Sequence, residues 1–180
     1  MRGGGMAVTQ APGRIPVSEY LRGGFEPDAE YVDGRIEERP VGEFDHAAWQ
    51  AAILSWFTQH AAAWAVFALP ELRVQVAPVR FRVPDVTVLD RGQPKEQIIT
   101  HAPLAVFEVL SPEDRVQRMT HKLSDYAAMG IAQIWVVDPE GPVYYRFQAG
   151  ELRRAEEFCL PGGPMRFQMR EIAALLPGGD

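Results

Sequence analysis

The sequence predicts an α/β fold in which helices pack on a mixed central sheet. Three features of the 180-residue chain support this: short segments with alternating apolar and polar residues, two long segments with apolar residues at helical spacing, and one seven-residue segment that is almost wholly apolar. Alternation is typical of a half-buried strand, the longer spacing of an amphipathic helix, and a continuous apolar run of a strand buried on both faces. Apolar residues make up 47% of the chain, which is enough for a core.

The N-terminal part of this fold begins with a hairpin and a long helix. Asp33-Gly34 predicts a tight two-residue turn, because both residues tolerate positive φ. Strict alternation after the turn places Glu38 on the same side as Ile36, the side that we take to face inward. A helix is expected over 45–64, with Asp45 as N-cap. Its apolar face consists of Trp49, Ile53, Trp56, Phe57 and Trp64, and its tryptophans are interpreted as core residues.

The remaining elements supply most of the predicted sheet. Short strands are expected over 72–76, 80–83, 85–89, 104–110 and 134–137, and a closing hairpin over 143–147 and 152–158 around Ala149-Gly150. A helix opens at Ser111-Pro112, where Ser can cap and Pro suits the first turn, and it ends at Gly130. Its apolar stripe comprises Val116, Met119, Leu123, Tyr126 and Ala127. A short helix over 169–176 completes the chain.

Composition limits the class of protein. The chain has 24 acidic and 18 basic residues, a net charge of -6, which argues against a passive nucleic-acid coat. The single Cys159 excludes an internal disulfide and a cysteine-based zinc cluster. No apolar segment approaches the roughly 20 residues that span a bilayer. Residues 1–16 lack the pattern of a secretory signal and are expected to form a flexible tail before one domain, 17–180. A cytoplasmic location is inferred by default.

The most informative residue for function is Glu108, because it is the one acid in the apolar segment 104–110. Burying an unpaired carboxylate costs roughly several kcal/mol, unless it is paired, protonated or bound to a metal. Asp85 follows Pro84 at the start of another predicted strand, and two acids on neighbouring strands can hold Mg²⁺. Each acid also has an ordinary explanation: Glu108 could pair with a buried Arg or reach solvent, and Asp85 could be a turn residue.

Lys122 is the third candidate. On a helical wheel it lies about 100° from Leu123, at the border of the apolar stripe on the Tyr126 side. If this helix packs back on the preceding strand, the ammonium reaches Glu108; otherwise it extends to water. Two carboxylates, a metal and a Lys form a site for phosphodiester cleavage. The metal polarises the phosphate and activates water, and the Lys orients that water or offsets developing charge.

Six short motifs follow one another along the chain: Tyr31-Val32-Asp33-Gly34, a helix opening at Asp45-His46, Pro84-Asp85, Glu108-Val109-Leu110-Ser111-Pro112, Lys122 with Tyr126 and Gly130, and Ile134-Trp135-Val136-Val137-Asp138-Pro139. Together they resemble the Uma family of proposed bacterial endonucleases, within the PD-(D/E)XK restriction-endonuclease-like superfamily. The resemblance covers about residues 18–160. It is specific as a set, although each dipeptide alone carries little information.

The resemblance implies a restriction-endonuclease-like mixed sheet and a metal-dependent endonuclease that hydrolyses DNA. It implies that Asp85 and Glu108 bind Mg²⁺ or Mn²⁺, with the carbonyl of Val109 as a further ligand. Many members of the superfamily carry Lys two residues after this acid, where this chain has Leu110. The resemblance therefore implies that Lys122, on the following helix, is the catalytic Lys.

Two further residues enter through the resemblance. Glu38 resembles the upstream acid of the family, with a role at a second metal or a metal-bound water, and Glu37 is the competing choice. His46 lies where the family often carries His, and a surface or capping role is the alternative. The resemblance also raises the expectation of a homodimer, because a two-fold pair readily cuts both DNA strands.

Two other functions stay open at this point. One is an inactive nuclease fold that binds nucleic acid or protein, since a fold does not guarantee activity. The other is a phosphoesterase for small nucleotides, for which an acidic exterior is a smaller handicap. Arg80 and Arg82 share a strand face and could form a basic stripe for DNA, or could be scattered solvated residues.

Overall fold

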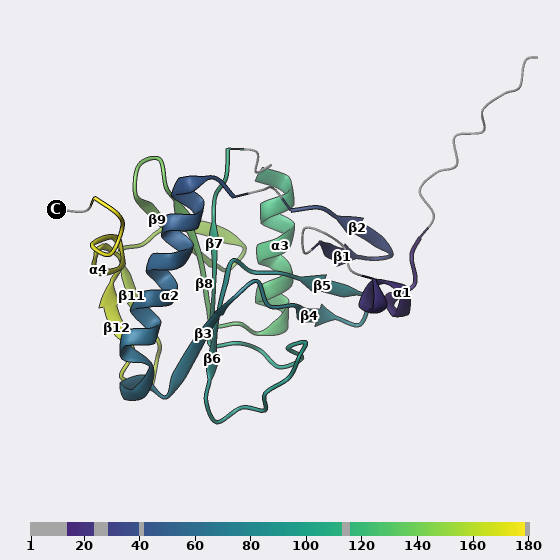
Figure 1. Ribbon diagram of the computed structural model, residues 1–180, viewed down its shortest axis with the longest axis horizontal. Helices are drawn as coiled ribbons and strands as arrows, with labels where there is room; N and C mark the ends of the chain where they lie inside the picture. The colour runs from purple at the N-terminus through teal and green to yellow at the C-terminus, as the bar shows by residue number, and fades with distance from the viewer. Residues whose placement is uncertain (1–13, 24–28, 40–41, 113–115, 179–180) are drawn as a thin grey trace, which may run out of the picture.

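The computed structural model of the chain describes residues 14–23, 29–39, 42–112 and 116–178. A six-stranded sheet, a four-stranded sheet and a two-stranded sheet make up its β structure. Figure 1 shows the six-stranded sheet between two long helices, with the four-stranded sheet projecting to one side. None of the helices in the described ranges combines the length and apolar character needed to cross a bilayer.

The six-stranded sheet is the centre of the fold. Its strands are β3 (Val66–Pro70), β6 (Val86–Asp90), β7 (Ala105–Val109), β8 (Gln133–Asp138), β9 (Val143–Gln148) and β10 (Glu151–Arg154). Their order is β10-β9-β8-β7-β6-β3, and β7 and β8 are its one parallel pair within the described ranges. The helix α3 (Val116–Met129) lies between β7 and β8 in the chain, because parallel neighbours need a crossover connection. The predicted α/β fold with a mixed central sheet is confirmed.

Each face of this sheet is covered by a different long helix. The helix α2 (Phe44–Trp64) packs on β3, β6 and β7, and its Phe57 shares an apolar cluster with Phe107. On the opposite face, Leu123 of α3 packs in a cluster with Val106. Since alternate residues of a strand point to opposite faces, Glu108 lies on the α3 face together with Val106.

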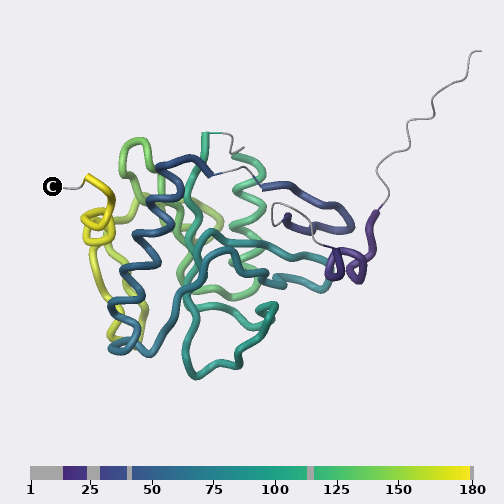
Figure 2. Tube along the Cα trace, viewed as in Figure 1, coloured from purple at the N-terminus to yellow at the C-terminus, as the bar shows by residue number. Residues whose placement is uncertain are grey.

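The C-terminal segment covers the outer side of α2. It contains β11 (Glu157–Cys159), β12 (Arg166–Gln168) and α4 (Met169–Ala173). The ring of Phe167 on β12 lies 5.5 Å from that of Trp56 and 5.7 Å from that of Trp64, between centroids. Figures 1 and 2 show α2 between this segment and the central sheet. A helix between two layers needs a broad apolar face. Trp49 is buried, and Trp56 and Trp64 are partly buried against the same cluster, which confirms that they pack in the core.

The four-stranded sheet has one apolar face and one charged face. Its order is β2-β1-β5-β4, formed by β2 (Arg35–Glu37), β1 (Glu30–Val32), β5 (Arg80–Arg82) and β4 (Val74–Ala77). Tyr31, Phe81 and Ile36 pack in one cluster with Tyr20 of α1 (Val17–Arg22). On the other face, Arg82 Nε donates to Asp125 of α3 at 2.8 Å. This charged face therefore points toward α3.

Several predicted elements agree with the structure and others differ. The Asp33-Gly34 turn is confirmed, with φ of 51° and 93°. The prediction that Asp45 is the N-cap of α2 is wrong, because Glu43 holds that place and makes no side-chain capping bond. The sequence does not predict strand β3. Ala65 ends α2 in the left-handed conformation and leads directly into the strand, so the usual Gly or Pro signal of a helix end is missing.

Other boundaries depend on tertiary contacts. The predicted strand over 152–158 is divided, because β10 joins the central sheet whereas β11 pairs with β12. The predicted helix start after Ser111 falls partly on residues 113–115, which lie outside the described residues. Most of the expected tail, residues 1–13, also lies outside them. Ile15 is held on the hairpin, with its N–H donating to the Gly34 carbonyl at 2.8 Å.

Candidate active site

The antiparallel pairing of β6 and β7 brings Asp85 next to Glu108. Val86, the first residue of β6, pairs with Phe107, so Asp85 before it lies beside the end of β7. The backbone N–H of Val109 donates to Asp85 Oδ2 at 2.7 Å, which fixes the two strand ends together. Both carboxylates are buried, with 3% of Asp85 and 2% of Glu108 exposed.

Lys122 enters the same place from α3. It lies one turn from Met119 and Tyr126 on the buried side of the helix, and it is 7% exposed. Its Nζ donates to Glu108 Oε2 at 2.7 Å, to Glu30 Oε1 at 2.9 Å and to the Val83 carbonyl at 3.1 Å. The structure therefore brings Asp85, Glu108 and Lys122 together, and the ammonium does not extend to water.

Glu108 is held on both oxygens. Tyr126 donates its hydroxyl to Oε1 at 2.7 Å, and Lys122 donates to Oε2. Burial raises the pKa of Glu108 to about 7, with Lys122 opposing the rise and the charges of Asp85 and Glu30 adding to it. Glu108 thus changes between its neutral and ionised forms near neutral pH.

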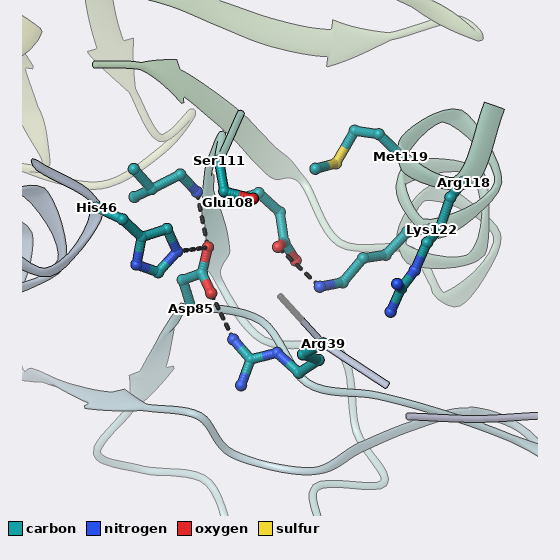
Figure 3. A pocket seen from close by; sticks show the side chains of 9 residues that line it. Arg39, His46, Asp85, Glu108, Ser111, Arg118, Met119 and Lys122 are labelled. Atoms are coloured by element: carbon teal, nitrogen blue, oxygen red, sulfur yellow. Dashed lines mark hydrogen bonds and ion pairs between the residues drawn. The ribbon is translucent and has the colours of Figure 1, made fainter. Parts of the chain in front are cut away.

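Asp85 has a contrasting environment rich in donors. Arg39 Nη2 donates to its Oδ1, and His46 Nε2 lies 3.2 Å from its Oδ2. Burial acts to raise the pKa of Asp85, but His46, Lys122 and Arg39 outweigh burial and hold that pKa below its usual value. The hydrogen bond to Asp85 in turn raises the pKa of His46. Figure 3 shows Asp85 between His46 and Arg39, with Glu108 directed toward Lys122.

His46 and Arg39 show what local patterns can and cannot find. His46 lies in the first turn of α2, and its contact with Asp85 favours the site over the surface role. Arg39 was not identified from the sequence. It follows β2 in the chain, and only the approach of this hairpin to the central sheet brings it to Asp85.

A small cavity opens between these groups. It is lined by Arg39, His46, Asp85, Glu108, Val109, Ser111, Arg118, Met119 and Lys122. Its volume is about 30 Å³, which is roughly the share of one water molecule in the liquid. The cavity therefore has room for an ion.

The donor set of the cavity fits a hard divalent cation. Mg²⁺ commonly takes one or two protein carboxylates and fills its shell with water and substrate oxygens. The hydrogen bonds among the described residues leave a lone pair on Asp85 Oδ1 and on each oxygen of Glu108. Within the described ranges, no group of three or more His, Cys, Asp or Glu side chains is arranged to hold a metal. Any metal here is thus expected to keep part of its water shell.

The structure does not bring Glu38 to the cavity. Strand β2 ends at Glu37, and Glu38 beyond it is exposed. Its exposure shows that the prediction from strand alternation, that Glu38 faces inward, is wrong. A second reason concerns the side of the hairpin. The inward side of Ile36 faces the Tyr20 and Phe81 cluster, whereas the site lies on the opposite, charged side of the hairpin.

The acid that reaches the site from this hairpin is Glu30, which the sequence analysis did not identify. It is fully buried and contacts both Lys122 and Arg82. A signal was available, because the Asp33-Gly34 turn sets Glu30 opposite Glu37. Two like charges in that arrangement need a cation between them, and Arg82 Nη1 lies 2.9 Å from Glu30 and 3.1 Å from Glu37.

Arg80 and Arg82 do share a strand face, since both contact Asp125, but they do not form an uncompensated basic stripe. Arg80 also pairs with Asp33 at 2.6 Å, and Arg82 is 2% exposed. Both charges are therefore paired with acids of the protein itself.

The central sheet, the two helices and the carboxylate pocket define a restriction-endonuclease-like α/β protein. The chain belongs to the Uma2 family, described as "Putative restriction endonuclease", whose model matches residues 17–167. No curated protein sequence matches the chain.

Two solved structures show similarity. One is the crystal structure of a "putative nuclease belonging to DUF820" from Anabaena variabilis ATCC 29413, with 22% identity and a TM-score of 0.75. The match covers 91% of this chain and 99% of that chain, so the two proteins share a fold. The other, the cryoEM structure of a DrdV-DNA complex, has 17% identity and a TM-score of 0.39 over 70% of this chain and 10% of that chain. The second similarity is too low to support an argument.

Proposed function

We propose that this protein is a metal-dependent endonuclease that hydrolyses DNA phosphodiester bonds at the pocket of Asp85, Glu108 and Lys122. The observation that carries the proposal is the convergence of two buried carboxylates and one ammonium around a cavity of ionic size. The family to which the chain belongs points to the same activity. The residues that would hold Mg²⁺ or Mn²⁺ are Asp85 and Glu108.

Each group in the pocket has a distinct task in this proposal. A bound divalent metal supplies a polarised phosphate oxygen and a water of lowered pKa. Glu108 has to be ionised to serve as a ligand. The three donors of the Lys122 ammonium are already matched by three protein acceptors. Lys122 therefore acts as a fixed positive charge beside the developing negative charge, which favours this task over orienting the attacking water.

The cavity suits an ion rather than a whole nucleotide. A substrate phosphate would meet this space of about 30 Å³ from outside, as the phosphate of a nucleic-acid backbone can do. The net charge of -6 gives little general attraction for phosphates. Binding would rest on local cations, and Arg39 and Arg118 both line the pocket.

Cleavage assays on plasmid and single-stranded DNA test the activity. We expect cleavage by the wild type with Mg²⁺ or Mn²⁺, none with a chelator, and none by Asp85→Asn or Glu108→Gln. Asp90→Asn is the matched control, because Asp90 ends the same strand β6 and bonds the Gly92 N–H outside the pocket. Equal cleavage by all variants would point to a contaminant. Retardation of DNA without cutting would instead indicate a binding module.

A calorimetric titration with Mn²⁺ tests the ligands separately from cleavage. Wild type and Asp90→Asn should bind the ion, whereas Glu108→Ala should lose most of the binding, because one of two carboxylate ligands is gone. The proposed metal site is ruled out if wild type and Glu108→Ala take up Mn²⁺ equally.

The homodimer stays a prediction that is separate from the site. Sedimentation equilibrium of the wild type, alone and with a short DNA duplex, distinguishes a monomer from a two-fold pair. A pair would place two pockets on one duplex, one for each strand.

A further inference from the structure

We propose that Glu30 is a positioning residue that holds the Lys122 ammonium in its place beside Glu108. Glu30 is 0% exposed and lies on β1, in the four-stranded sheet. Its Oε1 lies 2.9 Å from Lys122 Nζ and accepts the Val83 N–H at 3.1 Å. For its kinetic consequence this inference rests on the proposed nuclease function.

The contacts place Lys122 between two carboxylates. Glu108 Oε2 accepts from Nζ at 2.7 Å, and Glu30 Oε1 and the Val83 carbonyl take the other donors at 2.9 and 3.1 Å. A Lys side chain has several rotatable bonds, so one acceptor alone leaves its ammonium able to move. Three acceptors on separate elements, β1, the segment before β6, and β7, fix its position.

Glu30 is itself fixed, as a positioning residue has to be. Arg82 Nη1 donates to Glu30 Oε2 at 2.9 Å, and Arg82 also contacts Asp125 of α3 through Nη2 at 2.7 Å. A fully buried carboxylate is stable only when its charge is balanced and its oxygens are bonded. Lys122 and Arg82 supply both conditions, so Glu30 links the four-stranded sheet to the pocket.

Glu37 provides a matched control. It lies opposite Glu30 in the hairpin and contacts the same Arg82 Nη1, at 3.1 Å. The described contacts of Glu37 are to Arg82 and Arg118, and none is to Lys122. Glu30→Asp and Glu37→Asp therefore make the same chemical change on one ion-pair network, and only the first withdraws a carboxylate from the ammonium.

The readout is the NMR signal of the Lys122 ammonium in protein labelled with ¹⁵N-lysine. The chain has two lysines, and the other, Lys95, is exposed. A buried, hydrogen-bonded ammonium exchanges its protons slowly with water, and an exposed one exchanges them rapidly. The ammonium of Lys95 therefore serves as the rapidly exchanging reference. We expect a slow Lys122 signal in the wild type and Glu37→Asp, and faster exchange in Glu30→Asp.

Cleavage kinetics supply the functional readout. We expect kcat of Glu30→Asp to fall about 10- to 100-fold, as for other residues that orient a functional group. The KM for DNA and the Mn²⁺ affinity should stay as in the wild type, because Glu30 does not line the cavity and is not one of the proposed metal ligands. Glu37→Asp should keep kcat within about twofold, since Glu37 is partly exposed and has no described contact with Lys122.

The proposal is overturned if Glu30→Asp leaves both the Lys122 signal and kcat unchanged, or if Glu37→Asp alters them equally. If Glu30→Asp does not fold, Glu108→Ala replaces it. In that variant Glu30 still holds the ammonium, so a persisting slow signal supports the proposal and its loss refutes it. Absence of cleavage by the wild type would remove the proposed function, while the signals still decide whether Glu30 positions Lys122.

Discussion

The two faces of the central sheet differ in what holds the covering helix. On the α2 face, the ring of Phe57 lies 5.7 Å from Phe107 and 6.0 Å from Phe158, within a wholly apolar cluster. On the α3 face, an apolar cluster with Leu123 gives way at one end to the buried pair of Glu108 and Lys122. The described α2 cluster consists of aliphatic and aromatic residues, whereas the α3 face also carries a buried ion pair.

The difference shows where this fold accepts an electrostatic cost. Apolar burial stabilises the α2 face without any directional requirement. On the α3 face, each buried charge needs a partner, because removing one partner leaves the other uncompensated. Glu108, Lys122 and Glu30 meet this requirement through one another. Changes on the two faces should therefore have different effects on stability and chemistry.

The largest effect is expected for Lys122→Met, which leaves Glu30 and Glu108 buried without the shared cation. The free energy of unfolding should fall by about 3–5 kcal/mol, and cleavage by about 10²- to 10³-fold. Urea unfolding and the cleavage rate measure the two effects. Adding Glu30→Gln and Glu108→Gln should recover stability without activity. If Lys122→Met is as stable as the wild type, the buried network does not have the energetic role assigned to it.

On the other face, Phe57→Ala should affect stability alone. Removing a fully buried ring costs about 3–5 kcal/mol, while the Mn²⁺ affinity of the folded fraction should be unchanged. Phe57→Leu should lose less, because it leaves a smaller cavity. Urea unfolding and calorimetry make the measurements, and a loss of Mn²⁺ binding in folded Phe57→Ala would show that the two faces are coupled.

A smaller effect is expected in the pH dependence of the free energy of unfolding, to which Glu108 on the α3 face contributes. The pKa of Glu108 is raised from 4.5 to about 7, so over that window the native state binds more protons than the unfolded state. The contribution of Glu108 to the free energy of unfolding should therefore fall as pH rises, and Glu108→Gln should lack it. Mn²⁺ affinity should rise through the same window, because the ligand has to lose its proton.

Urea unfolding of wild type and Glu108→Gln at about pH 5, 6 and 7 isolates this contribution. The pKa of His46 is also raised, chiefly by its hydrogen bond to Asp85, and because both proteins keep Asp85 the difference between them removes most of the His46 effect. An unchanged difference across the three conditions would contradict the raised pKa of Glu108.

The smallest effect is expected for Glu38→Ala. An exposed side chain outside the cavity should change stability by no more than about 0.5 kcal/mol and leave the cleavage rate unaltered. The interpretation from strand alternation predicts the opposite, a large loss of activity. Parallel cleavage assays of Glu38→Ala and Glu30→Asp decide which acid of the hairpin serves the site.

Local sequence patterns, together with the family resemblance, were sufficient for the central part of the fold and for the three residues Asp85, Glu108 and Lys122 of the candidate site. Glu108 stood out because an acid inside an apolar strand has few stable environments. Asp85 followed from the start of a neighbouring strand, and Lys122 from its angle on the apolar stripe of α3. Each of these inferences uses residues of one element or of two elements that follow each other in the chain.

By itself the sequence determined both long helices and most strands of the central sheet, and it singled out Glu108 and Lys122 as the acid and the Lys at the edge of the core, because these follow from periodicity. Only the tertiary structure decided that Glu30 reaches Lys122, that Arg39 reaches Asp85, and that Glu38 stays exposed. The physical reason is that these residues belong to a hairpin whose charged face is directed toward α3 by its pairing with β5 and by Arg82. That orientation is set by partners about 50 residues away in the chain, beyond the range of any local pattern.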